Sequence, residues 1–199
     1  RWSPRGRRLL TAEWDGAARV HDGDTGEVLL TLRGHEMPLR SAEYSGDGRR
    51  IVTVSYDQTA KVWDAETGEE ILSAGGHRSE GVSSFEFLPS TGNVLTLTSG
   101  HLVEIRDPES WTLLARLPEP MDEPVLSPDG SLVACCRGRS VWNTRTGELV
   151  TRFGTAGQSL TSVEFDPDGI RLLTVGKDDS VRIWDAGSGV ELHSVDFGP

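Results

Sequence analysis

The stretch VSYDQTAKVWDAETGEE, from Val54 to Glu70, contains the residue types of two very different devices. Thr53 precedes it, Asp57 lies within it and His35 lies upstream, so these three residues could act as nucleophile, orienting acid and base in hydroxyl-dependent acyl transfer. The same stretch contains the segment AKVWD, which has relatives elsewhere in the chain. A catalytic group of residues is needed once, whereas a structural device can be repeated, so periodicity separates the two interpretations.

The AKVWD segment belongs to an internal repeat. Related segments are ARVHD, VEIRD, SVWN and VRIWD, and the five end at Asp22, Asp64, Asp107, Asn143 and Asp185. Their spacings are 42, 43, 36 and 42 residues. A period of about 40 residues indicates a repeat architecture.

Turn signals divide each repeat into short pieces. One turn precedes each segment, with a final Gly that tolerates positive φ: SPRG at Ser3, SGDG at Ser45, PSTG at Pro89, SPDG at Ser127 and DPDG at Asp166. A second turn follows four of the five segments: TGE at Thr25, Thr67 and Thr146, and SGV at Ser188. Between the turns lie short β-branched runs, and no stretch has the pattern of a long helix. Four short strands per repeat predict the four-stranded antiparallel blade of a β-propeller.

Together, GH (Gly34-His35 and Gly76-His77), SPDG and VWD are similar to the WD-repeat β-propeller family, over essentially the whole chain. The resemblance implies an all-β propeller with five blades, at residues 1–34, 35–76, 77–119, 120–154 and 155–199. The first blade would lack most of its inner strand and the fourth is degenerate. Seven blades are typical of the family. We therefore expect a fragment of a larger ring, which closes with the remaining blades of the same protein or with a second chain.

The resemblance also implies a structural role for the apparent triad. Well-formed blades of the family carry a buried chain of hydrogen bonds, and its positions match His35, Thr53, Asp57 and Trp63. Partial copies follow the repeat: Thr174, Asp178 and Trp184 in the fifth blade, Thr11 and Asp15 with His21 in the first, and His77 and Thr96 in the third. Such periodic, partly lost copies favour a structural tetrad over a catalytic triad.

Composition excludes several classes of partner. The formal net charge of −11, from 31 acidic and 20 basic residues, argues against a nucleic-acid backbone or an anionic membrane as the main partner. The two cysteines, Cys135 and Cys136, are adjacent in sequence, which disfavours a routine disulfide and indicates a reducing, cytoplasmic setting. Arginine far outnumbers lysine, as in GC-rich bacterial genomes. The basic start, RWSPRGRR, lacks the apolar region of a signal peptide, and the lack of an initiator Met suggests a chain cut from something longer.

No cofactor or metal is predicted. HDGDTGE, from His21 to Glu27, has the Asp-x-Asp spacing of a calcium loop but lacks its distal ligands, so a polar turn is favoured. The five histidines are scattered, without zinc-ligand spacing. SYDQTAKVW departs from the aspartate box of sialidases, and no GxxxxGK phosphate loop occurs.

With catalysis and metal binding disfavoured, the function that we expect is recognition of a partner. Family members commonly bind peptides or proteins on the face that carries the turns between the second and third strands of each blade. The resemblance places Trp14, Tyr56 and Lys177 there, just before the turn aspartates, with Arg40 nearby. Aromatic and Arg side chains are enriched at binding hot spots, so these four residues are the predicted partner site. The alternative is that the aromatics merely cover their own turns. A second candidate surface is RLPEPMDEPV, Arg116 to Val125.

We therefore predict a non-enzymatic scaffold for protein–protein interaction. The resemblance offers one alternative, a sensory or regulatory propeller within a larger bacterial signalling kinase or NTPase. A hydrolase that uses the propeller face is disfavoured, because no unrepeated cluster of acid, base and nucleophile occurs.

Overall fold

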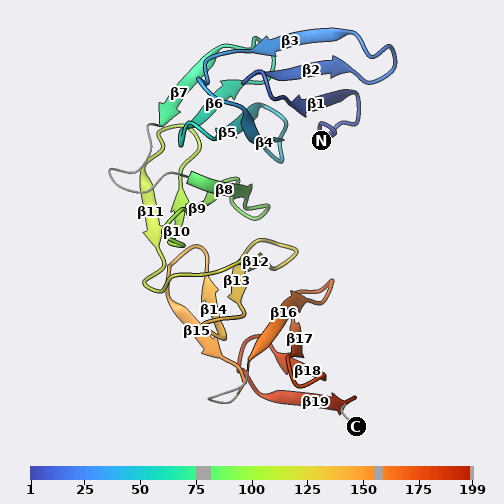
Figure 1. Cartoon of the computed structure of the whole chain (residues 1–199), viewed down its shortest axis with the longest axis vertical. Coiled ribbons are helices and arrows are strands. Elements are labelled where there is room, and N and C mark those ends of the chain that lie inside the picture. The colour runs from blue at the N-terminus through green and yellow to red at the C-terminus, as the bar shows by residue number, and fades with distance from the viewer. Residues whose placement is uncertain (75–81, 155–158, 198–199) are drawn as a thin grey trace. The chain divides into compact units, whose positions relative to one another are not determined.

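β-Strands form all the regular structure in the part of the chain that the structure describes (Figure 1). This computed structural model describes residues 1–74, 82–154 and 159–197. Its strands form four sheets of four strands and one sheet of three. The predicted all-β class, built of four-stranded antiparallel blades, is confirmed. Gly76, His77 and Gly81, and most of GTAG at Gly154, lie outside the described residues.

The sheets follow one another along the sequence, and each is built from consecutive strands. The first contains β1 (Arg8–Ala12), β2 (Ala18–Asp22) and β3 (Val28–Leu32). The second contains β4 (Leu39–Tyr44), β5 (Arg50–Ser55), β6 (Ala60–Asp64) and β7 (Glu70–Ala74). The third contains β8 (Val82–Phe87), β9 (Val94–Thr98), β10 (Val103–Arg106) and β11 (Leu113–Arg116).

Two further sheets complete the chain. The fourth contains β12 (Val125–Leu126), β13 (Leu132–Cys135), β14 (Ser140–Asn143) and β15 (Leu149–Arg152). The fifth contains β16 (Leu160–Phe165), β17 (Arg171–Gly176), β18 (Ser180–Asp185) and β19 (Glu191–Asp196). The first sheet has three strands plus an isolated antiparallel bridge between Trp2 and Leu9. The blade boundaries stay a prediction.

The turn before the last strand of each sheet has the same construction throughout. The side chain of Asp64 accepts hydrogen bonds from the backbone N–H groups of Glu66 and Thr67, at 2.9 Å each. Asp22, Asp107 and Asn143 make the same pair of bonds, and Asp185 accepts from Ser188. The repeated Asp is thus a turn residue.

The third repeat forms this turn without the glycine of the other four. Gly26, Gly68, Gly147 and Gly189 adopt φ values of 72° to 76°, and Trp111 occupies the equivalent position with φ of 57°. Its backbone N–H bonds to the carbonyl of Asp107 at 2.9 Å, as the glycines bond to their own Asp or Asn. The sequence showed four such turns, and the structure contains a fifth in which a bulky residue adopts the left-handed conformation.

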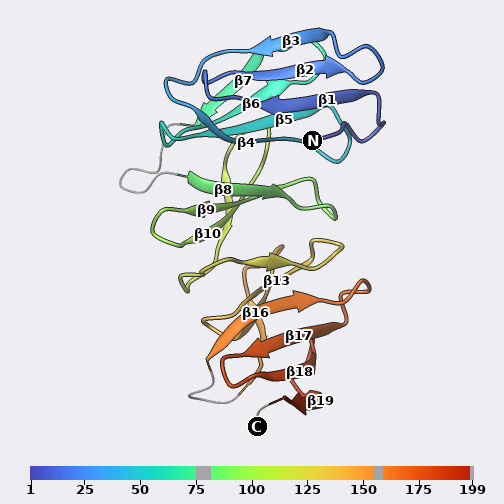
Figure 2. The same ribbon diagram turned by 45° about the vertical axis from the view of Figure 1, so that its right-hand side comes forward.

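The chain divides into two compact units. The first unit comprises Arg1–Phe87, Gly92–Gly100 and Arg106–Leu113, and the second comprises Leu88–Thr91, His101–Ile105 and Leu114–Pro199. In the first unit, β1 lies beside β4 (Figure 2), and a core forms where Leu10 and Val20 of the first sheet meet Ile51 and Trp63 of the second. In the second unit, the corresponding core holds Phe153, Leu172 and Trp184, among others. Within the described ranges, no helix is long and apolar enough to cross a membrane.

Candidate functional site

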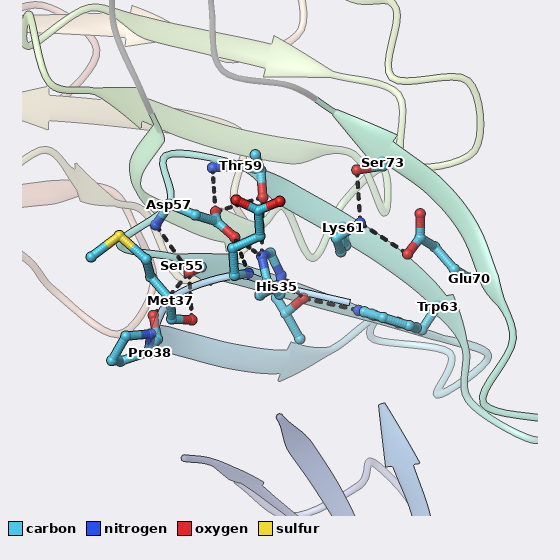
Figure 3. A network of polar contacts seen from close by, with 12 residues as sticks. His35, Met37, Pro38, Ser55, Asp57, Thr59, Lys61, Trp63, Glu70 and Ser73 are labelled. Carbon is cyan, nitrogen blue, oxygen red and sulfur yellow. Dashed lines mark hydrogen bonds and ion pairs between the residues drawn. The ribbon is translucent and has the colours of Figure 1, made fainter. Parts of the chain in front are cut away.

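The four tetrad positions of the second sheet lie in one chain of hydrogen bonds. The indole Nε1–H of Trp63 donates to Thr53 Oγ1 at 2.9 Å, and Thr53 Oγ1 lies 2.7 Å from His35 Nε2. His35 Nδ1 lies 2.9 Å from Asp57 Oδ2. Figure 3 shows His35, Asp57 and Trp63 in this arrangement. We call these four residues the brace.

The proton positions in the brace follow from its donors. An indole N–H only donates, so the Thr53 oxygen must accept from Trp63. The single hydroxyl proton of Thr53 is then free to point at His35 Nε2. His35 is therefore assigned as the neutral tautomer with its proton on Nδ1, which donates to the Asp57 carboxylate.

Burial governs the charge of the brace. The His35 side chain is 1% exposed, and burial lowers the pKa of its imidazole, although the neighbouring Asp57 opposes this effect. Burial alone would raise the pKa of Asp57, but hydrogen bonds from Thr59, from the Glu36 N–H and from His35 outweigh it, and the pKa is lowered. The stable pairing at neutral pH is a neutral imidazole beside an ionised carboxylate.

This geometry does not suit acyl transfer. The candidate nucleophile, Thr53, has no exposed surface, and its neighbour Trp63 is 2% exposed. A substrate carbonyl cannot reach Thr53 Oγ1 without unpacking the core, and that oxygen already accepts the Trp63 N–H. The brace instead ties β5 and β6 to the loop before β4.

The fifth sheet keeps only part of the brace. Trp184 Nε1 donates to Thr174 Oγ1 at 2.8 Å, as in the second sheet. Asp178 Oδ1 accepts from the N–H and hydroxyl of Ser180. The position equivalent to His35 lies outside the described residues.

The first and fourth sheets use substitutes. Thr11 Oγ1 lies 3.1 Å from His21 Nε2, so His21 takes the place of the tryptophan. Asp15 is directed elsewhere, to Arg19 and the Ala17 N–H, so the structure does not join it to Thr11. In the fourth sheet, Trp142 Nε1 donates to Ser140 Oγ at 2.9 Å, a contact that sequence reasoning missed.

Two side chains around the brace were also missed. Thr59 Oγ1 bonds to Asp57 Oδ1 at 2.6 Å and lies 3.0 Å from His35 Nδ1. Ser55 Oγ lies 2.9 Å from the carbonyl oxygens of both Met37 and Pro38 (Figure 3). The sequence contained a signal for this role of Thr59. Ser180 lies two residues after Asp178, as Thr59 lies two residues after Asp57, and it makes the same bond to its aspartate.

A salt bridge with a buried lysine lies next to the brace. Lys61 is 8% exposed, and its ammonium group donates to Glu70 and to the Ser73 hydroxyl, at 2.9 Å each (Figure 3). The positive charge of Lys61 further lowers the pKa of His35, and the negative charge of Glu70 opposes it.

Three of the four predicted partner residues meet in one exposed cluster. Trp14 is 82% exposed and Tyr56 is 45% exposed. Their rings stack with centroids 6.4 Å apart and an interplanar angle of 13°. The Arg40 guanidinium lies over the Tyr56 ring, 4.5 Å from its centroid. We call Trp14, Tyr56 and Arg40 the aromatic stack.

Hydrogen bonds from the brace region hold the aromatic stack in place. The Tyr56 N–H donates to the Pro38 carbonyl at 3.0 Å, and the Leu39 N–H donates to the Glu13 carbonyl at 3.2 Å. The Glu36 N–H donates to the Asp57 carboxylate at 3.0 Å. The loop before β4 is thereby tied both to the turn that carries Trp14 and to the turn that carries Tyr56.

Lys177 belongs to the second unit, so it is described apart from the stack. It follows β17, and its backbone N–H donates to the Ser159 carbonyl at 2.9 Å. With Cys136 and Val163 it lines a cavity of about 430 Å³. Burial raises the pKa of the Cys136 thiol to about 11, so this thiol is almost entirely protonated at neutral pH.

The residues that resembled a calcium loop form a turn. Asp22 Oδ1 accepts from the N–H groups of Asp24 and Thr25 and from the Thr25 hydroxyl. Elsewhere too, no group of three or more His, Cys, Asp or Glu residues is placed to hold a metal ion within the described ranges.

Comparison with known proteins identifies repeats of a known type at two positions of the chain. The family model described as "WD domain, G-beta repeat" matches residues 26–64 and 147–185, and both matches end on the Trp-Asp pair of a third strand. The chain carries WD40 repeats at these two positions. The first match contains all four brace residues, and the second contains the Trp184–Thr174 contact.

Three curated proteins are similar to this WD40-repeat chain. The transcriptional corepressor LEUNIG_HOMOLOG of Arabidopsis thaliana is 25% identical over 92% of this chain and 24% of its own length. Protein groucho of Drosophila melanogaster is 35% identical over 36% of this chain and 10% of its own length. The WD repeat-containing protein VIP3 of Arabidopsis thaliana is 46% identical over 22% of this chain and 14% of its own length. The chain thus spans a quarter or less of each relative.

Proposed function

We propose that this chain is a non-enzymatic binding module that engages a protein or peptide partner through the aromatic stack. The observation that carries the proposal is the exposure of Trp14, 82%, while its ring is held against Tyr56. A large aromatic side chain at a turn tip leaves much apolar surface in water. Contact with a partner would remove that surface from water.

The composition of the stack supports a binding role. Trp, Tyr and Arg are the side chains most enriched at the hot spots of protein interfaces. Two contacts hold Arg40. Its guanidinium group lies over the Tyr56 ring, and it donates a hydrogen bond of 3.3 Å to the Ser83 carbonyl. Side chains that are already ordered lose less conformational entropy on binding, which favours affinity.

The relatives support the same class of function. One of them is a transcriptional corepressor. Association with other proteins is the function we carry over to this chain. The alternative role within a bacterial kinase or NTPase would show itself as a kinase or nucleotide-binding motif in the neighbouring sequence of the gene.

A capture experiment tests the proposal. The whole chain, immobilised, is compared with a Trp14→Ala/Tyr56→Ala double variant, and captured proteins are identified by mass spectrometry. The matched control is Phe197→Ala, which removes another exposed aromatic ring, 69% exposed, from the second unit. We expect a partner that wild type and control capture and that the double variant loses, with the melting temperature unchanged. Equal capture by all three proteins would contradict the proposal.

Lys177 and the segment RLPEPMDEPV are proposed to contribute separately, because both belong to the second unit. Lys177→Ala and Asp122→Asn/Glu123→Gln variants in the same capture experiment test this. Loss of a partner from either variant would assign a second surface.

A further inference from the structure

Five arginines of the first unit lie near the Arg50 end of β5, the end farther from Tyr56. The strand begins at Arg50 and ends at Ser55, immediately before the stack. A cavity of about 430 Å³ lies at the Arg50 end. Its arginines are Arg5, Arg7, Arg8, Arg49 and Arg50, and three of them come from the basic start of the chain, RWSPRGRR.

The acids at this cavity neutralise only part of its charge. Arg8 pairs with Glu66 at 3.1 Å and Arg50 pairs with Asp64 at 3.1 Å. Two looser pairs are Arg49 with Asp47 at 4.0 Å and Arg50 with Glu109 at 3.8 Å.

Arg5 and Arg7 make no ion pair with any described residue. Two unneutralised guanidinium groups therefore line the cavity, in a chain whose net charge is −11.

Two buried donors at the same cavity also lack a partner. Tyr44 is 6% exposed, and neither its hydroxyl nor the buried Arg50 Nε has a hydrogen-bond partner among the described residues. Burial raises the pKa of the Tyr44 hydroxyl, so it keeps its proton for donation at neutral pH. Leaving such groups unpaired is costly, and buried polar groups are normally satisfied.

The turn that carries Arg5 and Arg7 is fixed before any ligand arrives. The Ser3 N–H donates to the Arg8 carbonyl at 2.8 Å, and the Gly6 N–H donates to the Ser3 carbonyl at 2.8 Å. The Gly23 N–H donates to the Arg7 carbonyl at 2.9 Å. The two guanidinium groups thus project from an ordered backbone, which reduces the entropy lost on binding.

We propose that this cavity binds a phosphate group, presented by a phosphomonoester or as the free ion. The guanidinium groups of Arg5 and Arg7 supply exposed donors, and Tyr44 and Arg50, whose buried hydroxyl and Nε lack a partner, line the same cavity. A phosphate dianion offers several acceptor oxygens in different directions, whereas a carboxylate offers two in one plane. Arginine is also the residue best suited to bidentate recognition of phosphate. This site is independent of the aromatic stack.

Titration of the whole chain with inorganic phosphate tests the proposal. The Arg Nε–Hε signals are followed by NMR at constant ionic strength, with chloride and acetate as reference anions. The same titration with a phosphoserine peptide and with its unphosphorylated form distinguishes a phosphomonoester from the free ion. The variants are Arg5→Gln/Arg7→Gln and Tyr44→Phe. The control is Arg145→Gln, which removes an exposed arginine of the second unit.

We expect phosphate to bind more tightly than chloride or acetate. Arg5→Gln/Arg7→Gln should weaken binding about tenfold or more, because two charge-assisted contacts are lost, and Arg145→Gln should leave it unchanged. Tyr44→Phe should weaken it by a smaller factor. Arg5→Gln/Arg7→Gln removes exposed side chains only, so it is interpretable even where Tyr44→Phe disturbs folding. Shifts no larger with phosphate than with chloride or acetate, or equal binding by the Arg5→Gln/Arg7→Gln and Arg145→Gln variants, would overturn the proposal.

Discussion

His35 Nδ1 and Asp57 Oδ2 lie 2.9 Å apart, and this contact ties the loop before β4 to the turn between β5 and β6. The same loop and turn carry the backbone contacts that position Tyr56. The residues that resemble a catalytic base and its orienting acid therefore support a surface. The brace is largely buried, and the aromatic stack is the exposed candidate for binding.

The brace should contribute measurably to stability. Thr53→Val keeps the shape of the side chain but strands the Trp63 N–H and His35 Nε2, and we expect it to lower the free energy of unfolding by about 1–3 kcal/mol. Urea denaturation measures the change. Thr151→Val, at a half-exposed position on β15, is the control and should change stability little. A Thr53→Val protein as stable as wild type would mean that the brace bonds carry no net stability.

The stability that His35 provides should depend on pH in a defined direction. Burial holds its folded-state pKa below 6.5, the usual value for histidine, so the unfolded chain binds a proton more readily than the folded chain. The stabilisation is present above pH 6.5 and is lost as the pH falls from there through the folded-state pKa.

Comparison with His35→Ala isolates this effect. The difference in unfolding free energy between wild type and the variant should be largest near neutral pH and should narrow on acidification. His193→Ala, which removes an imidazole from the exposed strand β19, is the matched control. A difference that grew as the pH fell would reverse the assigned sign.

Trp111 offers a test of backbone strain. It adopts φ of 57° at the turn position where the other four repeats have glycine, and it also packs against the core that includes Val52 and Phe85. Trp111→Ala removes the ring and keeps the strain, whereas Trp111→Gly removes both. We expect the Gly variant to be the more stable of the two by about 1 kcal/mol in thermal or urea unfolding. An Ala variant of equal or greater stability would show that the left-handed conformation carries no penalty here.

The thiol of Cys136 should be slow to alkylate. Its pKa is raised to about 11 from the usual 9.0, which leaves about 100-fold less thiolate near neutral pH than an ordinary cysteine has. We expect iodoacetamide to label it far more slowly in the native protein than in urea, as followed by mass spectrometry. Native labelling as fast as that of the unfolded chain would contradict the assigned burial effect.

Features that depend on one repeat could be predicted from the sequence. The Asp64 turn, the glycine turns and the positions of Trp63 and Thr53 follow from local patterns that recur with a period. The predicted partner residues Trp14 and Tyr56 hold equivalent positions in neighbouring repeats, and in the structure their rings stack.

Features that depend on packing between sheets could not be predicted in this way. The arginine-lined cavity combines Arg5 and Arg7, from a turn of the first repeat, with Tyr44 and Arg50 of the second. No local pattern reports which side chains of two adjacent sheets face a common space. The contact of Trp142 with Ser140 was missed for another reason, because the shortened fourth repeat obscures the usual offset between partners.

The most direct test is the dissociation constant of a partner captured as described above, measured for wild type, Trp14→Ala, Tyr56→Ala and Phe197→Ala by calorimetry. The account predicts that Trp14→Ala and Tyr56→Ala each weaken binding by about 2 kcal/mol, roughly 30-fold, because each removes an exposed hot-spot residue. Phe197→Ala should bind like wild type, and all four melting temperatures should agree. Wild-type affinity in both stack variants would contradict the central claim that the aromatic stack is the binding surface.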